Sequence, residues 1–576
     1  MRILLLTHSF NSLTQRLFAE LTARGHELSV EFDIADSVTE EAVALFRPDV
    51  VVAPFLKRAI PASVWRTVVC LVVHPGIKGD RGPSALDWAI TNRETTWGVT
   101  VLQANAQMDG GDIWARAEFP MRDARKSSLY RHEVTEAALR AVLLALDRLA
   151  SRSFQPEALD YSSPDVRGQL RPLMRQADRR IDWTRDDTGT VLRKIRAADG
   201  NPGVLDEVRG LACHLYDAHG EARLRGATPG ALIARRHGAI LRATRDGAVW
   251  ITHLKPVAAG DERTFKLPAT MVLGTRIDDV PEAPVADFTA GDAGTWREIW
   301  YEEAGGVGYL HFDFYNGAMS SDQCERLRRA FEHAARRPTR VIVLMGGRDF
   351  WSNGIHLNVI EAADSPADES WRSINAMDDV ALAVLTCESH LTVAALQGNT
   401  AAGGVFLALA ADEVWARDGV VLNPHYKNMG NLFGSEYWTY SLARRVGIEG
   451  GRHVMQRRFP LLARDAATMH LINACLGAED FVDEVKARAQ ALALDPALPQ
   501  HLAAKHQQRS RDEEAKPLAA YRAEELERMK LNFYGFDPSY HIARHNFVAK
   551  VPHSWTPRHL ARHRSRGFVP PQEVAA

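Results

Sequence analysis

The stretch Val68-Val69-Cys70-Leu71-Val72-Val73 decides the fold of the N-terminal half. It has the same texture as an earlier run, Asp49-Val50-Val51-Val52-Ala53-Pro54. Continuous β-branched runs indicate strands buried on both faces, which is typical of a parallel sheet with helices on either side. Ahead of both, Ile3-Leu4-Leu5-Leu6 precedes a segment in which Leu13, Leu17 and Leu21 recur at helical spacing. This part of the chain therefore predicts an α/β domain.

Length and charge exclude several classes of protein. The chain has 576 residues, with 70 Lys or Arg against 72 Asp or Glu, so its formal net charge is −2. This length predicts about three domains rather than one core. The near-neutral balance argues against a nucleic-acid-binding protein. No apolar run approaches the ~18 residues of a membrane span, and the N-terminal run is too short for a secretory signal.

The cysteines point to a reducing compartment. All five are scattered, with no C-x-x-C pair, so they indicate neither a disulfide framework nor a cysteine metal site. We therefore expect a cytoplasmic protein without a metal and without a nucleic-acid or membrane partner.

Changes in residue composition and hydrophobic pattern divide the chain into segments. Short strands and turns, such as Val249-Trp250-Ile251-Thr252, predict a small β domain, and an acidic stretch rich in Pro, Gly and Ala is typical of a linker. Strand and helix patterns then resume, with a capping box at Ser320 and Gln323. We expect five segments: an N-terminal α/β domain at 1–175, the β domain at 176–278, the linker at 279–295, a second α/β domain at 296–500 and a C-terminal helical extension at 501–576.

A histidine and an aspartate follow two predicted strands of the first domain. His74 comes directly after Val73, and Asp109 lies in Met108-Asp109-Gly110-Gly111-Asp112-Ile113, which follows the strand Trp97–Leu102. Functional groups of open α/β folds gather at strand ends. The carboxylate can orient the imidazole, which can then transfer a proton or stabilise an oxyanion. The alternative is that His74 merely ends a strand and Asp109-Gly110 is a turn.

These motifs resemble the signature of folate-dependent formyltransferases. The likeness runs through His74-Pro75, Arg81-Gly82-Pro83 and Asp109-Gly110-Gly111-Asp112-Ile113, and Ile181-Asp182-Trp183 resembles the start of that family's C-terminal β domain. It implies a Rossmann-type sheet, an OB-like β domain and 10-formyltetrahydrofolate as formyl donor. His74 and Asp109 match the catalytic His and Asp, whereas Val72 stands where the family has its catalytic Asn. Losing a neutral oxyanion donor typically costs roughly 10²–10³ in rate, so we expect a different acceptor or oxyanion arrangement.

Three polar residues near the predicted strand ends are candidate folate or coenzyme A ligands: Asn11, Gln15 and Arg131. The alternative for each is a solvated helix face.

Two glycine motifs mark the second α/β domain. Phe350-Trp351-Ser352-Asn353-Gly354-Ile355 follows a predicted strand, and Ala401-Ala402-Gly403-Gly404-Val405-Phe406 opens a predicted helix. Backbone N–H groups at the start of a helix suit a thioester oxygen that becomes an oxyanion. The alternative is a close-packed helix start.

The pair of motifs resembles the crotonase (enoyl-CoA hydratase/isomerase) superfamily, over about 300–447. The resemblance implies a ββα superhelix with C-terminal helices, in which the N–H groups of Ile355 and Gly403 form the oxyanion hole. The hydratase glutamates fall on Phe406 and Tyr426, which cannot act as that acid and base at pH 7, so hydration is not expected. Asn316 lies where crotonases approach coenzyme A.

The order of the two halves, with Ser539-Tyr540-His541-Ile542-Ala543-Arg544, resembles the HypX/HoxX hydrogenase-maturation family along the whole chain. The resemblance implies formyl transfer from 10-formyltetrahydrofolate to coenzyme A, then decarbonylation of formyl-CoA to carbon monoxide for a [NiFe]-hydrogenase. Arg544 becomes a ligand-binding candidate, Tyr426 a proton relay or formyl-positioning group, and Phe406 a lining that excludes water. Other maturation proteins become candidate partners. The alternatives are a formyl-CoA hydrolase or acyl transferase, and a non-catalytic scaffold.

Overall fold

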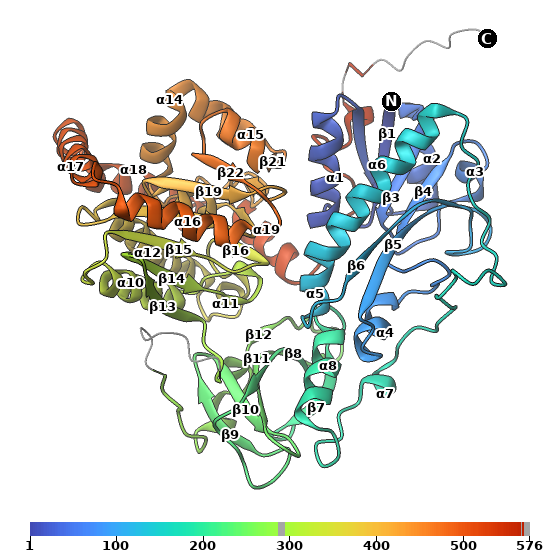
Figure 1. Ribbon diagram of the computed structural model, residues 1–576, viewed down its shortest axis with the longest axis horizontal. Helices are drawn as coiled ribbons and strands as arrows, with labels where there is room; N and C mark the ends of the chain where they lie inside the picture. Colours follow the sequence, from blue (N-terminus) through green and yellow to red (C-terminus); the bar gives the residue numbers. More distant parts are fainter. Residues whose placement is uncertain (286–293, 566, 569–576) are drawn as a thin grey trace.

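The computed structural model describes residues 1–285, 294–565 and 567–568. It has three bodies: an N-terminal α/β domain on the right of Figure 1, a second α/β domain on the left, and a β domain below and between them. Within these ranges, no helix is long and apolar enough to cross a membrane.

The N-terminal domain is built on a sheet of order β2-β1-β3-β4-β5-β6. Its strands are β1 (Arg2–Thr7), β2 (Glu27–Phe32), β3 (Val50–Phe55), β4 (Cys70–His74), β5 (Thr96–Gln103) and β6 (Ile113–Pro120). The first four pair in parallel, as their apolar runs predict. The last two extend the sheet in antiparallel pairing, so the sheet is mixed.

Helices cover both faces of this sheet. Its helical elements are α1 (Ser12–Ala23), α2 (Asp36–Phe46), α3 (Ala62–Trp65), α4 (Ala85–Thr91), α5 (Lys126–Leu129), the π-turn η1 (Tyr130–Val134) and α6 (Thr135–Ser151). Along β1, Ile3 and Leu5 share a buried cluster with α1 and α6, whereas Leu4 and Leu6 share one with α2 and α3. Alternate side chains of a strand point to opposite faces, so this run must be apolar throughout.

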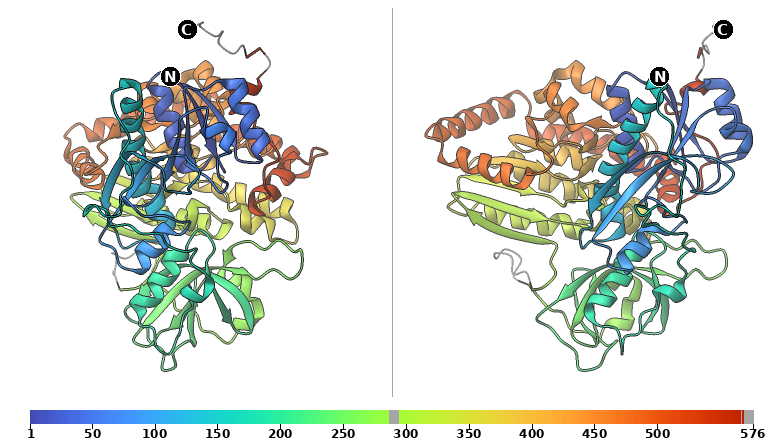
Figure 2. Two further views of the ribbon diagram at one scale, coloured as in Figure 1. Left: turned by 90° about the vertical axis from the view of Figure 1, so that its right-hand side faces the viewer. Right: turned by 45° about the vertical axis from the view of Figure 1, so that its right-hand side comes forward.

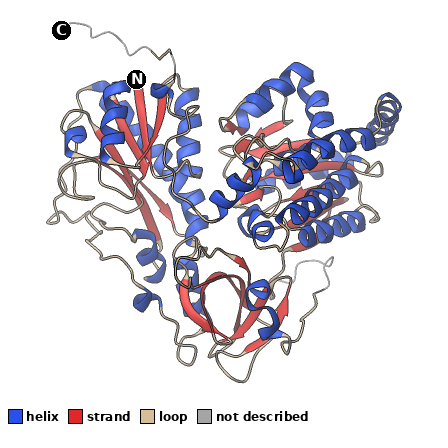
Figure 3. Ribbon diagram, turned by 180° about the vertical axis from the view of Figure 1, so that it is seen from behind, coloured by secondary structure: helices blue, strands red, loops and turns tan. Residues whose placement is uncertain are grey.

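The β domain is an antiparallel sheet of order β7-β8-β11-β10-β9, with β12 beside β11; Figure 3 shows its strong curvature. Its strands are β7 (Val204–Val208), β8 (Leu211–Glu221), β9 (Leu232–Arg236), β10 (Ala239–Ala243), β11 (Ala248–Pro256) and β12 (Leu267–Pro268). Its helices are α7 (Gln176–Arg179), α8 (Thr188–Ala198), α9 (Ala269–Leu273) and the 3-10 turn η2 (Gly274–Ile277).

The expected linker, 279–295, is attached to the β domain at both ends. Val280 is buried in that domain's core, and Ala283 donates to the carbonyl of Arg235 on β9 at 3.0 Å. The carbonyl of Gly294 accepts from Ala222 at 2.8 Å. The central residues, 286–293, lie outside the described residues.

The second α/β domain contains two sheets, of order β13-β14-β15-β17-β19-β22 and β16-β18-β20-β21. Their strands are β13 (Ile299–Ala304), β14 (Val307–Phe312), β15 (Val341–Met345), β16 (Phe350–Ser352), β17 (Leu391–Leu396), β18 (Asn399–Ala401), β19 (Glu413–Arg417), β20 (Val421–Asn423), β21 (Leu461–Leu462) and β22 (Ala474–Leu476). The helices are η3 (Tyr315–Gly317), α10 (Ser321–Ala334), α11 (Leu357–Glu361), α12 (Pro366–Leu385), α13 (Gly403–Leu409), α14 (Trp438–Gln456), α15 (Ala463–Thr468) and α16 (Phe481–Leu494). The predicted capping box is confirmed: Ser320 Oγ accepts from Gln323 N, and the Gln323 side chain accepts from Ser320 N.

The C-terminal helices belong to the second α/β domain. They are α17 (Leu498–Ala515), α18 (Leu518–Tyr534) and α19 (Ser539–Val548), and Leu518, Met529 and Tyr540 are buried in that domain's core. Beyond them, residues 549–565, here called the C-terminal segment, cross to the N-terminal domain, where Val30 of β2 donates to the carbonyl of Leu560 at 3.0 Å. Figure 2 shows this return (red) beside the N-terminal sheet (blue). We propose a domain boundary near residue 548 rather than 500.

Candidate active sites

The first site lies at the end of β4. His74 is buried, with its Nδ1 3.7 Å from Asp109 Oδ1 and its Nε2 2.9 Å from Asp80 Oδ2. Asp109 adopts a left-handed φ of 52° on the β5–β6 loop, and its Oδ2 accepts from Gly82 N at 3.2 Å. The structure therefore brings together the two predicted side chains and adds a carboxylate that the sequence did not single out.

The second site is built from two backbone N–H groups. Gly403 is the first residue of α13, so its N–H has no partner within the helix. Gly354 adopts a left-handed φ of 81°, and a Cβ there would lie 3.3 Å from Gly403 N, so the Ile355 loop passes close to the start of α13. Among the described residues, neither Ile355 N nor Gly403 N donates to a backbone carbonyl outside regular elements. Both are available to a thioester oxygen.

Tyr426 meets a carboxyl group at this second site. Its hydroxyl donates to Glu436 Oε2, and a Cβ at Gly403 would lie 2.1 Å from Glu436 Oε1. Phe406 stacks on Tyr426 with 5.4 Å between ring centroids and is fully buried. Burial and the neighbouring Asp378 raise the pKa of Glu436 to about 8, so this carboxyl is largely protonated at neutral pH.

Two further buried carboxyls support Glu436 from behind. Asp378 Oδ1 accepts from Glu436 N at 2.8 Å, and Asp378 Oδ2 accepts from Ser435 Oγ at 2.9 Å. Glu525 of α18 accepts from Tyr437 N at 3.0 Å. Burial raises the pKa of Asp378 to about 7 and that of Glu525 to about 8. The turn that presents Glu436 is thus held by Asp378 and Glu525, and the proximity of these two carboxyls helps to raise the pKa of Glu436.

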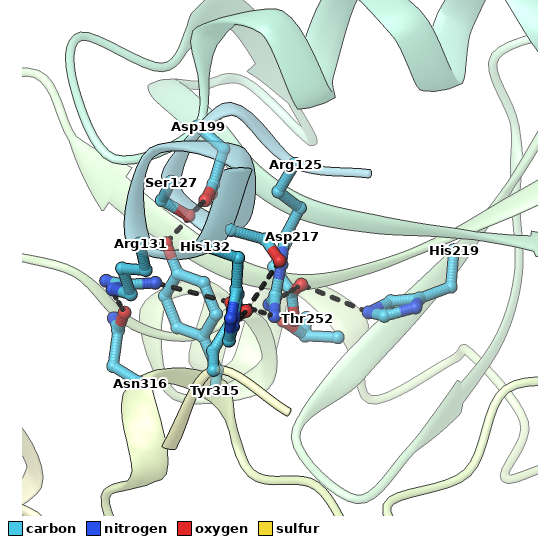
Figure 4. A network of polar contacts seen from close by, with 12 residues as sticks. Arg125, Ser127, Arg131, His132, Asp199, Asp217, His219, Thr252, Tyr315 and Asn316 are labelled. Carbon is cyan, nitrogen blue, oxygen red and sulfur yellow. Dashed lines mark hydrogen bonds and ion pairs between the residues drawn. The ribbon is translucent and has the colours of Figure 1, made fainter. Parts of the chain in front are cut away.

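Arg131 and Asn316 meet where the three bodies join. Arg131 Nη2 donates to Asn316 Oδ1 at 3.0 Å, and Arg131 Nη1 donates to Asp349 Oδ2 at 3.3 Å. Figure 4 shows this contact beside Arg125, which pairs with Asp217 of the β domain and also with Asp349. Arg125 and Arg131 are balanced here by Asp217 and Asp349, so an anionic ligand that reached both halves would have to share these guanidinium groups with the carboxylates.

Gln15 and Asn11 lie on the same side of the N-terminal domain. Gln15 Oε1 accepts from Asn423 Nδ2 of the second domain at 3.0 Å, three residues before Tyr426. Asn11 caps α1, with its Oδ1 accepting from Thr14 N at 3.0 Å. Gln15 therefore lies at the interface between the halves, whereas Asn11 has a role in the fold that needs no ligand.

Arg544 is buried on α19, where its Nε donates to Glu361 Oε2 at 2.7 Å. A ligand phosphate would have to share this guanidinium with the carboxylate. Among the described residues, no group of three or more His, Cys, Asp and Glu side chains could hold a metal ion.

Sequence reasoning missed Glu436 and Asp80. Glu436 lies in Gly434-Ser435-Glu436-Tyr437, which matches no catalytic pattern, and it reaches the site because Glu436 and Tyr437 both adopt a left-handed φ of 59°. Asp80 lies in the loop that follows His74, the last residue of β4. A carboxylate six residues after a candidate catalytic histidine was the signal that could have indicated it.

The domains that carry the two candidate sites match known protein families. Family models match formyl transferase over 25–146, the formyl transferase C-terminal domain over 173–261 and enoyl-CoA hydratase/isomerase over 302–557. A methionyl-tRNA formyltransferase of Desulfotalea psychrophila is 26% identical over 221 residues, which cover 38% of this chain and 66% of that protein.

Two relatives match along the whole length. Hydrogenase maturation factor HoxX of Bradyrhizobium diazoefficiens is 53% identical over 567 residues, covering 98% of each chain. The crystal structure of HypX from Aquifex aeolicus in complex with tetrahydrofolic acid superposes with a TM-score of 0.95 at 49% identity, covering 99% of this chain and 100% of that one. With more than half of its residues identical to HoxX and nearly the whole length of both relatives in common, this chain belongs to the HypX/HoxX family of hydrogenase maturation factors.

Proposed function

We propose that the protein makes carbon monoxide in two steps, and that formyl transfer is the first. The thiol of coenzyme A loses its proton to His74, and the thiolate attacks the formyl carbon of 10-formyltetrahydrofolate. The new C–S bond forms, the C–N bond breaks, and the proton passes to the folate nitrogen, with Asp109 stabilising the imidazolium between the two transfers. The tetrahydrofolic acid in the HypX crystal structure supports folate as the donor's product.

The second step is decarbonylation of formyl-CoA, and the Tyr426–Glu436 pair beside the two free N–H groups is the observation that carries it. The thioester oxygen would accept from Ile355 N and Gly403 N. The protonated Glu436 gives its proton to sulfur as the C–S bond breaks, and the carboxylate then takes the formyl hydrogen as a proton. The electron pair of the C–H bond stays on carbon, so the products are carbon monoxide and coenzyme A.

Water must be excluded from this second site, because hydrolysis of formyl-CoA would give formate instead. The stacked rings of Phe406 and Tyr426 support such exclusion, since Phe406 is fully buried. Tyr426 donates to Glu436, so we assign it the orientation of the carboxyl group.

Coenzyme A would stay bound through both steps and present its thiol to each site in turn. Two contacts between the halves support this route. Arg131 contacts Asn316 and Gln15 contacts Asn423, and three of these four residues are themselves candidate ligands of folate or coenzyme A. Labelled formyl-CoA added during turnover should then exchange poorly with the enzyme-bound intermediate. Ready exchange would contradict retention.

The test of the proposed function is to incubate the purified protein with 10-formyltetrahydrofolate and coenzyme A while measuring carbon monoxide with a haem trap and formate enzymatically. We expect carbon monoxide without stoichiometric formate. Formate alone would indicate a formyl-CoA hydrolase, and neither product would indicate a scaffold.

Paired variants separate the two sites. His74→Ala should abolish product from 10-formyltetrahydrofolate yet still release carbon monoxide from supplied formyl-CoA. Glu436→Gln should do the reverse, accumulating formyl-CoA.

We also propose that both steps run in the cytoplasm, since all five cysteines are free thiols, and that other maturation proteins receive the product.

A further inference from the structure

The formyl-transfer site lacks the polar side chain expected at position 72. Val72 and His74 are two residues apart on β4, so their side chains share a face of the sheet. Val72 is half-buried and can neither donate nor accept a hydrogen bond through its side chain. The strand itself therefore supplies no partner for a reacting group beside His74.

A different residue contacts the histidine. Asp80 Oδ2 lies 2.9 Å from His74 Nε2, and both side chains are almost fully buried, at 1% and 5% exposure. The second oxygen, Asp80 Oδ1, is buried without a hydrogen-bond partner among the described residues. An unpartnered buried carboxylate oxygen is costly to keep, which indicates a functional role for this group.

The loop around Asp80 is built to hold this contact. A Cβ at Gly76 would lie 2.5 Å from both Asp80 Oδ2 and His74 Nε2, so only glycine leaves room for the pair. Asp80 N donates to the carbonyl of Ile77 at 2.9 Å. From outside, Gly168 packs so closely that its own Cβ would lie 1.9 Å from Asp80 N.

We propose that Asp80 is the positioning residue of the formyl-transfer site. It acts through His74 and compensates for the missing asparagine at position 72. The carboxylate accepts from Nε2–H and thereby leaves Nδ1 unprotonated and directed toward Asp109. This inference rests on the proposed function. A thiol must lose its proton to become a strong nucleophile, so a base backed by a carboxylate suits coenzyme A as acceptor. The thiol proton goes to Nδ1, the thiolate forms the C–S bond, and the proton leaves with the folate nitrogen.

The other charged groups near the ring have partners of their own. Lys78 Nζ pairs with Asp165 at 2.8 Å and also with Glu157. The Arg81 guanidinium donates to the carbonyl of Met108 at 2.7 Å. Within the described residues, the recorded ionic partners of His74 are Asp80 and Asp109 alone.

The experiment follows coenzyme A-dependent release of tetrahydrofolate by the full-length protein, across pH, for Asp80→Asn and Asp80→Ala. We expect the rate to fall by roughly 10²-fold in both, because His74 remains but is no longer held in the tautomer that accepts the thiol proton. In Asp80→Asn, which keeps an oxygen for Nε2–H, the acid limb of kcat/KM should also move to lower pH, because the imidazolium loses a carboxylate that favours it. A merely structural role would not move that limb.

Three controls keep the result interpretable. Asp123→Asn removes an 82% exposed carboxylate of the same domain and should leave rate and profile unchanged. Tetrahydrofolate binding and release of carbon monoxide from supplied formyl-CoA should survive in Asp80→Asn, which shows that the protein is folded. Val72→Asn added to Asp80→Ala should not restore the rate.

The outcomes are distinguishable. If Asp80→Asn transfers formyl groups at the wild-type rate with an unchanged pH profile, the role of Asp80 is refuted while the proposed function stands. Full rescue by Val72→Asn would refute it as well, since a neutral donor would then suffice. If the wild-type protein releases no tetrahydrofolate with coenzyme A, the proposed function fails, and this inference fails with it.

Discussion

Asp378→Asn should stabilise the protein at alkaline pH. Asp378 is completely buried, and its two oxygens accept from Glu436 N and Ser435 Oγ. Asparagine can keep both contacts, since its oxygen accepts from the same N–H and its amide can donate to the serine oxygen, leaving that hydroxyl to donate to Glu525. The substitution therefore removes a charge and leaves the packing nearly unchanged.

The magnitude follows from the pKa of Asp378, which burial raises from the ordinary 3.8 to about 7. That difference corresponds to roughly 4 kcal/mol as an upper limit. Because the folded-state pKa is the higher one, this stability is fully present below about pH 4 and is lost as the pH rises through about 7. Asparagine has no charge to bury, so its contribution does not change with pH. We expect the free energy of unfolding of Asp378→Asn to exceed that of the wild type by ~1–3 kcal/mol at pH 8.5. Each kcal/mol corresponds to about 2–4 °C in melting temperature.

Thermal melts at pH 5.5, 7 and 8.5 test this for the wild type, Asp378→Asn and the control Asp379→Asn. Asp379 is the neighbouring carboxylate, but it is 48% exposed and pairs with Arg522, so its loss should bring no gain that grows with pH. If the melting temperature of Asp378→Asn equals that of the wild type at every pH, burial of the Asp378 carboxylate does not destabilise the protein. The same conclusion follows if Asp379→Asn raises the melting temperature as much. Since Asp378 also helps to raise the pKa of Glu436, the variant should lose carbon monoxide formation at a lower pH than the wild type.

Three further outcomes are expected. Tyr426→Phe should lower carbon monoxide output from supplied formyl-CoA and leave tetrahydrofolate binding intact; output at the wild-type rate would remove Tyr426 from the mechanism. Gly403→Ala should cost roughly 10²–10³ in the same assay, because the methyl group would displace Glu436 from beside the oxyanion hole, while formyl-CoA synthesis continues. His563→Ala should lower the free energy of unfolding by about 1–3 kcal/mol, because the fully buried Glu31 loses its contact with His563 at 2.9 Å but keeps Arg564 and Thr556; an unchanged melting temperature would show that the His563 contact contributes nothing to stability.

Local patterns were sufficient for most of the fold. The run at Val50–Phe55 had to be a buried strand, and the capping box at Ser320 fixed the start of α10. The pairing of β5 with β4 could not be read in this way, because strand direction depends on the chain path rather than on apolar periodicity. The same holds for the C-terminal segment, whose contact with Val30 joins the two ends of the chain.

The candidate sites also differ in how far local sequence patterns could predict them. The proposed oxyanion hole needs only a backbone path, so the resemblance of two short glycine motifs to the crotonases was enough to predict Ile355 and Gly403 as its donors. Glu436 acts through a side chain whose direction depends on two consecutive left-handed residues and on Asp378 and Glu525 behind it. No spacing rule encodes such a turn, so the acid that we propose for the second site could not be predicted from the sequence.

The contacts between the halves bear on how formyl-CoA moves between the two sites. Arg16 is buried and donates to the carbonyl of Gly419 at 2.7 Å, and Arg125 joins the N-terminal domain to Asp349 at 3.1 Å. Parting the halves would strand the buried Asp349, whose partners Arg125, Arg131 and Ser128 all lie in the N-terminal domain, at a cost of roughly 3–5 kcal/mol. Hinge opening in every turnover is therefore disfavoured. We therefore infer that the flexible thiol arm of bound coenzyme A, rather than a movement of the domains, connects the two proposed sites.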